Sequence, residues 1–364
     1  MKQTVYIICI LVTGMFLFGC SKNQGEQATA PSTKTEAVQE DAKIDRDKIP
    51  ETYQKTGQQI SFDCSVTAPE TVQLTKCTAE ILPVTSEQVK QYLIGNQTIV
   101  SQDTFSDTSY QYVLENNVYC TYNENVVVYM QPDIVEKVYG SLRLSCSDES
   151  NDSAYKQEEL QSFSKSQAVD SLYEMLSKFD IDTQELIQNI YVLDKDTLEQ
   201  EFVAGDDMTE EVEFSTEDEG YYMLCRQTLQ GLPVFIQSGG ALTNDEPDNV
   251  PITAYYTQNG FQDIELRDLY TFHEGDEALE LLSFYDVADK VKQYYEKLLT
   301  ESTYQITRAV LYQYVKNGDD GNISVTPVWI FSGEEQYKDE SGQEQSHYFQ
   351  IEINAQNGEV YNIG

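Results

Sequence analysis

Basic residues are scarce in this chain. Its 364 residues include 23 Lys and Arg against 62 Asp and Glu, which gives a formal net charge of −39 at pH 7. An acidic surface repels nucleic-acid phosphates and anionic lipid headgroups, so the composition excludes nucleic acid as a partner and membrane docking through basic patches. We interpret the acidity as a means of solubility, with cation binding as the alternative.

The sequence also lacks the motifs of the common enzyme classes. It contains no Gly-x-Ser-x-Gly, no Walker loop and no His-Glu-x-x-His. The two histidines, His273 and His347, lie in different segments, so we expect neither a catalytic triad nor a His-based metal site. Carboxylates are so numerous that a glycosidase pair cannot be chosen among them. We therefore predict no catalysis, no cofactor and no metal site.

An acidic run extends from Asp206 to Glu219. Its spacing matches no EF-hand loop, and a Ca²⁺ ion needs oxygen ligands that converge on it. We interpret the run as a solvated insertion between strands, with a Ca²⁺ site as the alternative.

Cysteines are few, and no Cys-x-x-Cys occurs, which argues against a zinc ribbon or a thioredoxin-like site. Beyond the N-terminal segment the chain has Cys64, Cys77, Cys120, Cys146 and Cys225. An odd number cannot all pair. We predict Cys64–Cys77 and Cys120–Cys146 as possible disulfides, because each pair lies within one strand-rich region, with buried reduced thiols as the alternative.

The first 20 residues have the pattern of a lipoprotein signal. Lys2 precedes an apolar run from Val5 to Phe18, which is too short to span a bilayer comfortably, and Gly19-Cys20 follows. Cleavage after residue 19 would leave Cys20 free for lipidation, although Phe18 is bulkier than the usual residue there. An ordinary signal peptide or an uncleaved anchor is the alternative. We predict an exported protein, lipid-anchored on the extracytoplasmic face of the cell membrane.

Composition divides the remaining chain. Residues 20–50 contain no aromatic residue and few large apolar ones, which predicts a disordered tether behind the 1–19 signal peptide. We predict an N-terminal sheet-rich α+β domain over 51–149, then a Ser-, Asp- and Glu-rich linker, and two further units over 160–267 and 268–364.

Local patterns place strands and one short helix in the first domain. Ile60 to Val66 alternate with polar residues as in a half-buried strand, and Thr85 or Ser86 can cap a helix that runs through Leu93. Further strands are predicted near 72–82 and at 110–114, 118–122 and 126–130, the last three separated by Asn-rich turns.

The two later units contain recurring landmarks. Each begins with an amphipathic helix, predicted over 165–179 and about 286–300. Pro233-Val234-Phe235 recurs as Pro327-Val328-Trp329, and the hairpin signal Asn259-Gly260 recurs as Asn357-Gly358. We interpret these matches as one unit used twice, with chance recurrence of Asn-Gly turns as the alternative.

At these residues a resemblance appears. The segments 226–235 and 353–360 resemble PepSY-like and thermolysin-propeptide-like modules. The mature chain also looks like an uncharacterised lipoprotein family of Gram-positive gut anaerobes, through Ile49-Pro50-Glu51-Thr52-Tyr53, Pro327-Val328-Trp329 and the terminal turn. The resemblance implies an α+β fold of antiparallel sheets, each packed by a helix, with tandem PepSY-like units after the N-terminal domain. Related modules occur in extracytoplasmic regulators of a membrane histidine kinase and in inhibitory propeptides, and they carry no catalytic residues.

Tyrosine is abundant, with 26 residues against one Trp. In the strand pairs Tyr221-Tyr222 and Tyr255-Tyr256, adjacent side chains face opposite sides, so we expect one Tyr of each pair in the core and one exposed. Both faces of the strand around Trp329 are apolar, which predicts a central strand with Trp329 packed on the helix residues Val287, Val291 and Leu298.

We predict that the protein is a binding or regulatory module, held at the membrane by its lipid and acting on a membrane or cell-wall protein. The alternative is a lipoprotein that binds cell-wall or dietary glycans. A cleft lined with exposed tyrosines and amides would favour a glycan, and a flat apolar patch would favour a protein partner.

Overall fold

The computed structural model describes eleven parts of the chain: residues 49–69, 74–106, 108–123, 125–132, 137–138, 155, 159–202, 212–236, 250–317, 323–339 and 341–363. These residues form seventeen strands and four α-helices, so the protein is mostly β-sheet. None of the described helices is both long enough and apolar enough to cross a membrane.

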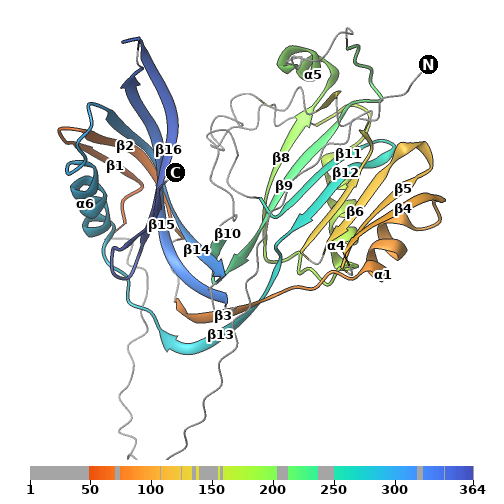
Figure 1. Ribbon diagram of the computed structural model, residues 1–364, viewed down its shortest axis with the longest axis horizontal. Coiled ribbons are helices and arrows are strands. Elements are labelled where there is room, and N and C mark those ends of the chain that lie inside the picture. The colour runs from red at the N-terminus through yellow and green to blue at the C-terminus, as the bar shows by residue number, and fades with distance from the viewer. Residues whose placement is uncertain are drawn as a thin grey trace, which may run out of the picture. The chain divides into compact units, whose positions relative to one another are not determined.

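Eight strands form one antiparallel series (Figure 1). In spatial order they are β4 (Ile99–Ser106), β5 (Ser109–Leu114), β6 (Tyr119–Asn123), β7 (Val126–Met130), β12 (Gly260–Arg267), β11 (Ile252–Thr257), β9 (Gly220–Leu229) and β8 (Leu186–Leu193). The hairpin signal Asn259-Gly260 lies at the β11–β12 turn, as predicted.

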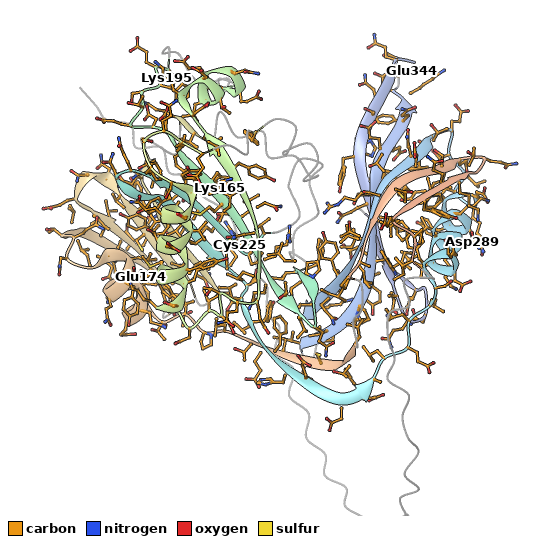
Figure 2. The ribbon with its side chains drawn as sticks, turned by 180° about the vertical axis from the view of Figure 1, so that it is seen from behind. Lys165, Glu174, Lys195, Cys225, Asp289 and Glu344 are labelled. Carbon is orange, nitrogen blue, oxygen red and sulfur yellow. The ribbon has the colours of Figure 1, made fainter. Side chains whose placement is uncertain are left out.

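Two helical segments cover one face of this series. Helix α4 (Lys165–Ser177) begins at Ser164, whose side chain accepts a hydrogen bond from the Gln167 backbone N–H at 3.2 Å. The other segment is α1 (Ser86–Gln88), which is capped by Thr85 and continues as the π-helix η2 (Val89–Ile94). Glu174 lies on the outer side of α4 (Figure 2).

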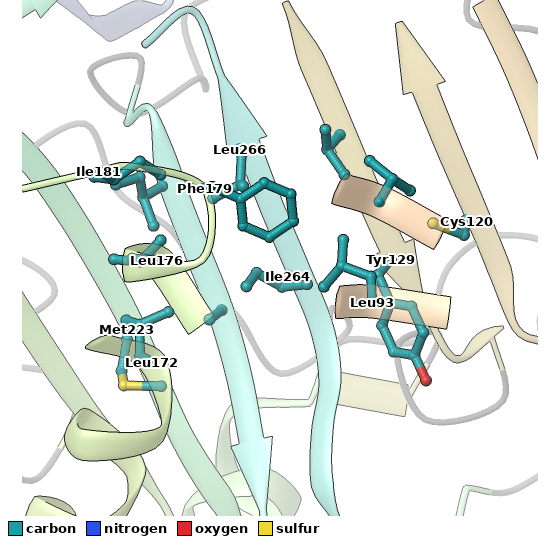
Figure 3. Close-up of a cluster of buried hydrophobic side chains, with 14 of the residues drawn as sticks. Leu93, Cys120, Tyr129, Leu172, Leu176, Phe179, Ile181, Met223, Ile264 and Leu266 are labelled. Carbon is teal, nitrogen blue, oxygen red and sulfur yellow. The ribbon is translucent and has the colours of Figure 1, made fainter. Parts of the chain in front are cut away.

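The apolar side of α4 packs on the sheet. Leu172 and Leu176 are fully buried and belong to one cluster with Met223 of β9 and with Ile264 and Leu266 of β12 (Figure 3). Burying one Leu side chain contributes about 1.5–3 kcal/mol, so the spacing of these leucines by four residues holds the helix on the strands.

A second series contains the C-terminal strands. In spatial order it is β1 (Thr52–Thr56), β2 (Ile60–Thr67), β14 (Thr303–Asn317), β15 (Ile323–Lys338), β16 (Glu344–Asn354) and β17 (Val360–Ile363). The β2–β14 pair is parallel and the others are antiparallel. Helix α6 (Phe284–Tyr295), capped by Ser283, packs on one face through Phe284, Val287 and Val291.

Three more strands complete the sheet, and one of them, β10 (Leu232–Ile236), joins the two series. This strand pairs with β9 and, in parallel, with β14. The strands β3 (Thr75–Ile81) and β13 (Tyr270–Ala278) pair with each other, and β3 also meets β15 at Ser324. The seventeen strands thus form one mixed sheet. The shorter helical elements are η3 (Glu115–Asn117) and α5 (Lys195–Glu201).

The predicted fold class, an α+β arrangement of tandem helix-packed units, is therefore wrong. The N-terminal strands do not form a sheet of their own. Instead β2 pairs with β14, β3 with β13 and β7 with β12, so the segment predicted as the 51–149 domain contributes strands to both series. Hydrogen bonds between segments far apart in sequence merge the predicted units into one sheet.

The prediction that residues 160–267 and 268–364 repeat one unit is wrong, because the strands of the two segments are arranged in different orders. Pro327-Val328-Trp329 lies in β15, between β14 and β16. Pro233-Val234-Phe235 lies in β10, which leaves β9 after two paired residues and joins β14. The two Pro-Val-aromatic motifs therefore occupy unrelated places in the sheet.

A glycine allows β14 and β15 to approach each other closely at one point. The ladder between β14 and β15 shifts its register between Ile306 and Arg308, opposite Gly333. A Cβ atom at Gly333 would overlap the backbone carbonyl oxygen of Gln305. A residue with a side chain therefore cannot occupy this position unless the strands move apart.

Candidate functional site

The predicted modification sites are only partly within the described structure. Cys20, the predicted lipidation site, and Cys146 lie outside the described residues. Cys64 and Cys77 are free, buried thiols, so the predicted Cys64–Cys77 disulfide is absent. Their strands, β2 and β3, have different partners, and the two thiols belong to different core clusters. Cys120 is also a free, buried thiol.

The two histidines lie on different strands, as their sequence separation predicts. His273 of β13 has its Nε2 4.0 Å from a carboxylate oxygen of Glu80. His347 of β16 lies 3.2 Å from Glu335, whose other oxygen accepts a hydrogen bond from Tyr304 at 3.1 Å. Within the described parts of the chain, no group of three or more His, Cys, Asp or Glu residues is placed to hold a metal ion.

The acidic run is described only from Val212 onward. Glu213 and Glu217 are exposed, whereas Asp218 is buried. The Asp218 carboxylate accepts hydrogen bonds from the Ser215 backbone N–H at 2.7 Å and from its hydroxyl at 2.9 Å. Asp218 thus closes a local turn.

Most of the tyrosines that the structure describes are buried. Tyr221 and Tyr222 lie on opposite faces of β9, but both are buried because both faces are covered there, so the prediction that one is exposed is wrong. Tyr255 is buried and Tyr256 half-buried. Trp329 is 1% exposed and shares a cluster with Val287 and Val291 of α6, with Leu298 packed against it, as predicted. Trp329, Tyr221, Tyr222 and Tyr255 are therefore not available as an exposed platform for a sugar ring.

One face of β12 carries a row of charged side chains. Asp263, Glu265 and Arg267 alternate with the core residues Ile264 and Leu266, so they lie on the face opposite α4. Asp263 is buried, and Glu265 forms an ion pair with Arg267.

Burial raises the pKa of Glu265, and the Arg267 guanidinium opposes that shift. Burial is also the main reason why the pKa of Tyr222 on β9 is raised, and the Asp263 and Glu265 carboxylates raise it further. We interpret this row as a polar cluster stabilised by its own ion pair.

Exposed apolar side chains gather instead on β4. All eight residues of this strand are exposed, including Ile99 at 40%, Val100 at 66% and Phe105 at 67%. Among the described residues, β4 pairs with β5 alone, so its other edge has no strand beside it (Figure 1). Unpaired N–H and C=O groups on such an edge can bind another extended chain.

The backbone of β4 is irregular near both of its ends. The register against β5 shifts between Ile99 and Ser101 and again between Thr104 and Ser106. Val100 and Phe105 are therefore the extra residues of two β-bulges, and a bulge redirects the side chain it carries. Asp103, the one charged residue of the strand, lies between them.

The strand β4 is not predicted by the pattern of its sequence. Its apolar residues, Ile99, Val100 and Phe105, do not alternate with polar ones, because the bulges interrupt the period of two. The remaining sequence signal is the content of β-branched and aromatic residues between the turn-forming Gly95-Asn96 and the turn before Ser109.

Comparisons with known proteins agree with the fold and go no further. The sequence matches no protein-family model and no curated protein. Among solved structures, the chain is similar to an uncharacterized protein from Eubacterium rectale ATCC 33656, with a TM-score of 0.63 and 15% sequence identity. That match covers 87% of this chain and 95% of the other. At such low identity the similarity shows a shared fold alone.

Proposed function

We propose that this protein is a lipid-anchored, extracytoplasmic binding module that acts on a protein partner through β4. The observation that supports the proposal is that three exposed apolar residues, Ile99, Val100 and Phe105, lie on one strand whose other edge has no paired strand among the described residues. Such an edge can pair with an extended segment of another protein, and the exposed apolar side chains beside it add contact area.

The free energy available from burying these apolar side chains is sufficient to support binding of a partner. Complete burial of a side chain such as Val or Phe contributes about 1.5–3 kcal/mol, so Val100 and Phe105 together contribute about 3–6 kcal/mol before the costs of association. Val100 is 66% and Phe105 67% exposed in the free protein, so most of this free energy remains for binding.

The proposed contact can be tested by crosslinking in living cells. A photo-crosslinking amino acid at Phe105 should give a discrete protein adduct, because this side chain would be buried by the partner. The matched control is the same amino acid at Leu299, a fully exposed apolar position away from β4 in sequence, which should give no such adduct. Equal adducts from both positions, or none from Phe105, would show that β4 is not the contact.

The anchoring is tested separately. Cys20→Ala should abolish lipid labelling and release the protein from the membrane fraction. A variant that stays membrane-bound after a high-salt wash would contradict the lipoprotein signal.

A further inference from the structure

We propose that the β4 edge binds a short, extended and basic segment of the partner, which adds to the sheet as a further strand. This inference rests on the proposed function, since it names the chemistry of the partner at the same surface. It follows from three properties of β4: the length of its regular edge, its charge and the positions of its apolar side chains.

The regular part of the edge is short. Ser101 to Thr104 pair with β5 without interruption, and the bulges at Val100 and Phe105 end the regular ladder on both sides. In an antiparallel strand, alternate residues direct their N–H and C=O groups away from the existing neighbour. About two of these four residues can therefore bond a new strand, which suits a short peptide segment better than a long strand.

Charge decides between a second copy of this chain and a different protein. Each copy carries a formal net charge of −39, and two copies paired at β4 would bring their Asp103 carboxylates to the same contact. Like charges that meet across strands are destabilising, and repulsion between two strongly acidic proteins slows their encounter. A partner segment with Lys or Arg near Asp103 is instead attracted to this acidic protein and stabilised on the strand by the opposite charge.

The apolar side chains set the pattern of the segment. Val100 and Phe105 are five residues apart, which corresponds to roughly 16 Å along a strand at about 3.3 Å per residue. Each lies beside one end of the regular edge. The segment that fits has a basic residue near its centre and an apolar residue at each end.

The first test uses the full mature chain and a displayed library of random seven-residue peptides. Selected peptides should carry Lys or Arg at the centre and apolar residues at the ends. Asp103→Lys should remove the preference for basic peptides, whereas Asp170→Lys, at an exposed position of α4, should not. The absence of enriched peptides, or enrichment of acidic ones, would overturn the proposal.

The second test separates strand addition from contact by side chains. In the best peptide, N-methylation of alternate residues that face β4 should weaken binding at least about tenfold, and N-methylation of the intervening residues should leave it unchanged. Equal effects of both sets would overturn strand addition. The crosslink at Phe105 would then still support the proposed function, so the two ideas fail independently.

The third test addresses self-association. The mature chain should remain monomeric by light scattering at concentrations where the peptide binds. A dimer that disappears in Phe105→Ser would identify a second copy as the occupant and overturn the proposal.

Discussion

Replacing Trp329 by Ala should strongly destabilise the part of the sheet that contains β15. Trp329 is 1% exposed, pairs with Leu311 on β14 and Ile353 on β16, and its ring lies 5.0 Å from that of Phe284 on α6. The side chain therefore links a central strand to the helix that covers it. No smaller side chain can fill this space from the same position.

The cost can be estimated from the burial. Truncating a buried Trp to Ala commonly costs about 3–5 kcal/mol, because the transfer free energy is lost and a cavity remains. A folded domain is stable by about 5–15 kcal/mol, so this single change removes a large share of that stability. Trp329→Phe keeps an aromatic ring against Phe284 and should cost clearly less.

Urea unfolding followed by far-UV circular dichroism measures both variants, since the signal does not depend on the Trp. The wild-type protein offers an independent check because Trp329 is its one indole. Its native emission should be blue-shifted and resist acrylamide quenching. A loss below about 1 kcal/mol in Trp329→Ala, or a red-shifted and freely quenched native spectrum, would refute the packing argument.

Three further predictions follow from buried groups. Gly333→Ala should destabilise the protein by several kcal/mol in urea unfolding, because the new Cβ would overlap a backbone oxygen. Gly342→Ala has open space around the new Cβ but a positive φ, so it should cost only about 1–2 kcal/mol. Equal costs for the two variants would contradict this prediction. Burial raises the pKa of Glu265 above 4.5, so its charged form disfavours the folded state once the pH exceeds that value. The stability of Glu265→Gln relative to wild type should therefore rise between about pH 4 and about pH 7, and a fall would show that the Arg267 ion pair outweighs burial. Burial also raises the pKa of Cys120 and Cys225 to about 12; both thiols should resist alkylation at about pH 8 in the native protein and react in urea, and rapid native labelling would show that they are accessible.

Local features of the fold were predictable from the sequence. The cap at Ser164 and the apolar spacing after it correctly predict α4. The period of two correctly predicts β2, and the Asn-rich turns correctly separate β5, β6 and β7. The second helix begins at Phe284, after the cap at Ser283, and ends at Tyr295, so its predicted limits of 286 and 300 are shifted. These features depend on neighbours within a few residues, which is the range that a sequence pattern records.

The candidate site shows the limit of the same reasoning. The candidates from the sequence were the tyrosine pairs, the histidines and an acidic run. None of them lies on β4, the strand with the exposed apolar side chains. This strand was missed because its two bulges break the alternation that identifies a strand. Its exposure depends on its place at the margin of the sheet.

The sequence by itself determined the cap and apolar face of α4, the hairpin turn at Asn259-Gly260, the acidic composition, and the pattern from which the lipid anchor is predicted. Only the tertiary structure decided which strands pair across long sequence separations. The parallel β2–β14 and β10–β14 ladders join residues separated by more than 70 positions, and they merge the predicted units into one sheet. A strand's alternation specifies which face is buried but carries little information about its neighbour, because every strand offers the same backbone donors and acceptors. The choice of neighbour, and with it the free edge of β4, is settled by the packing of the whole chain.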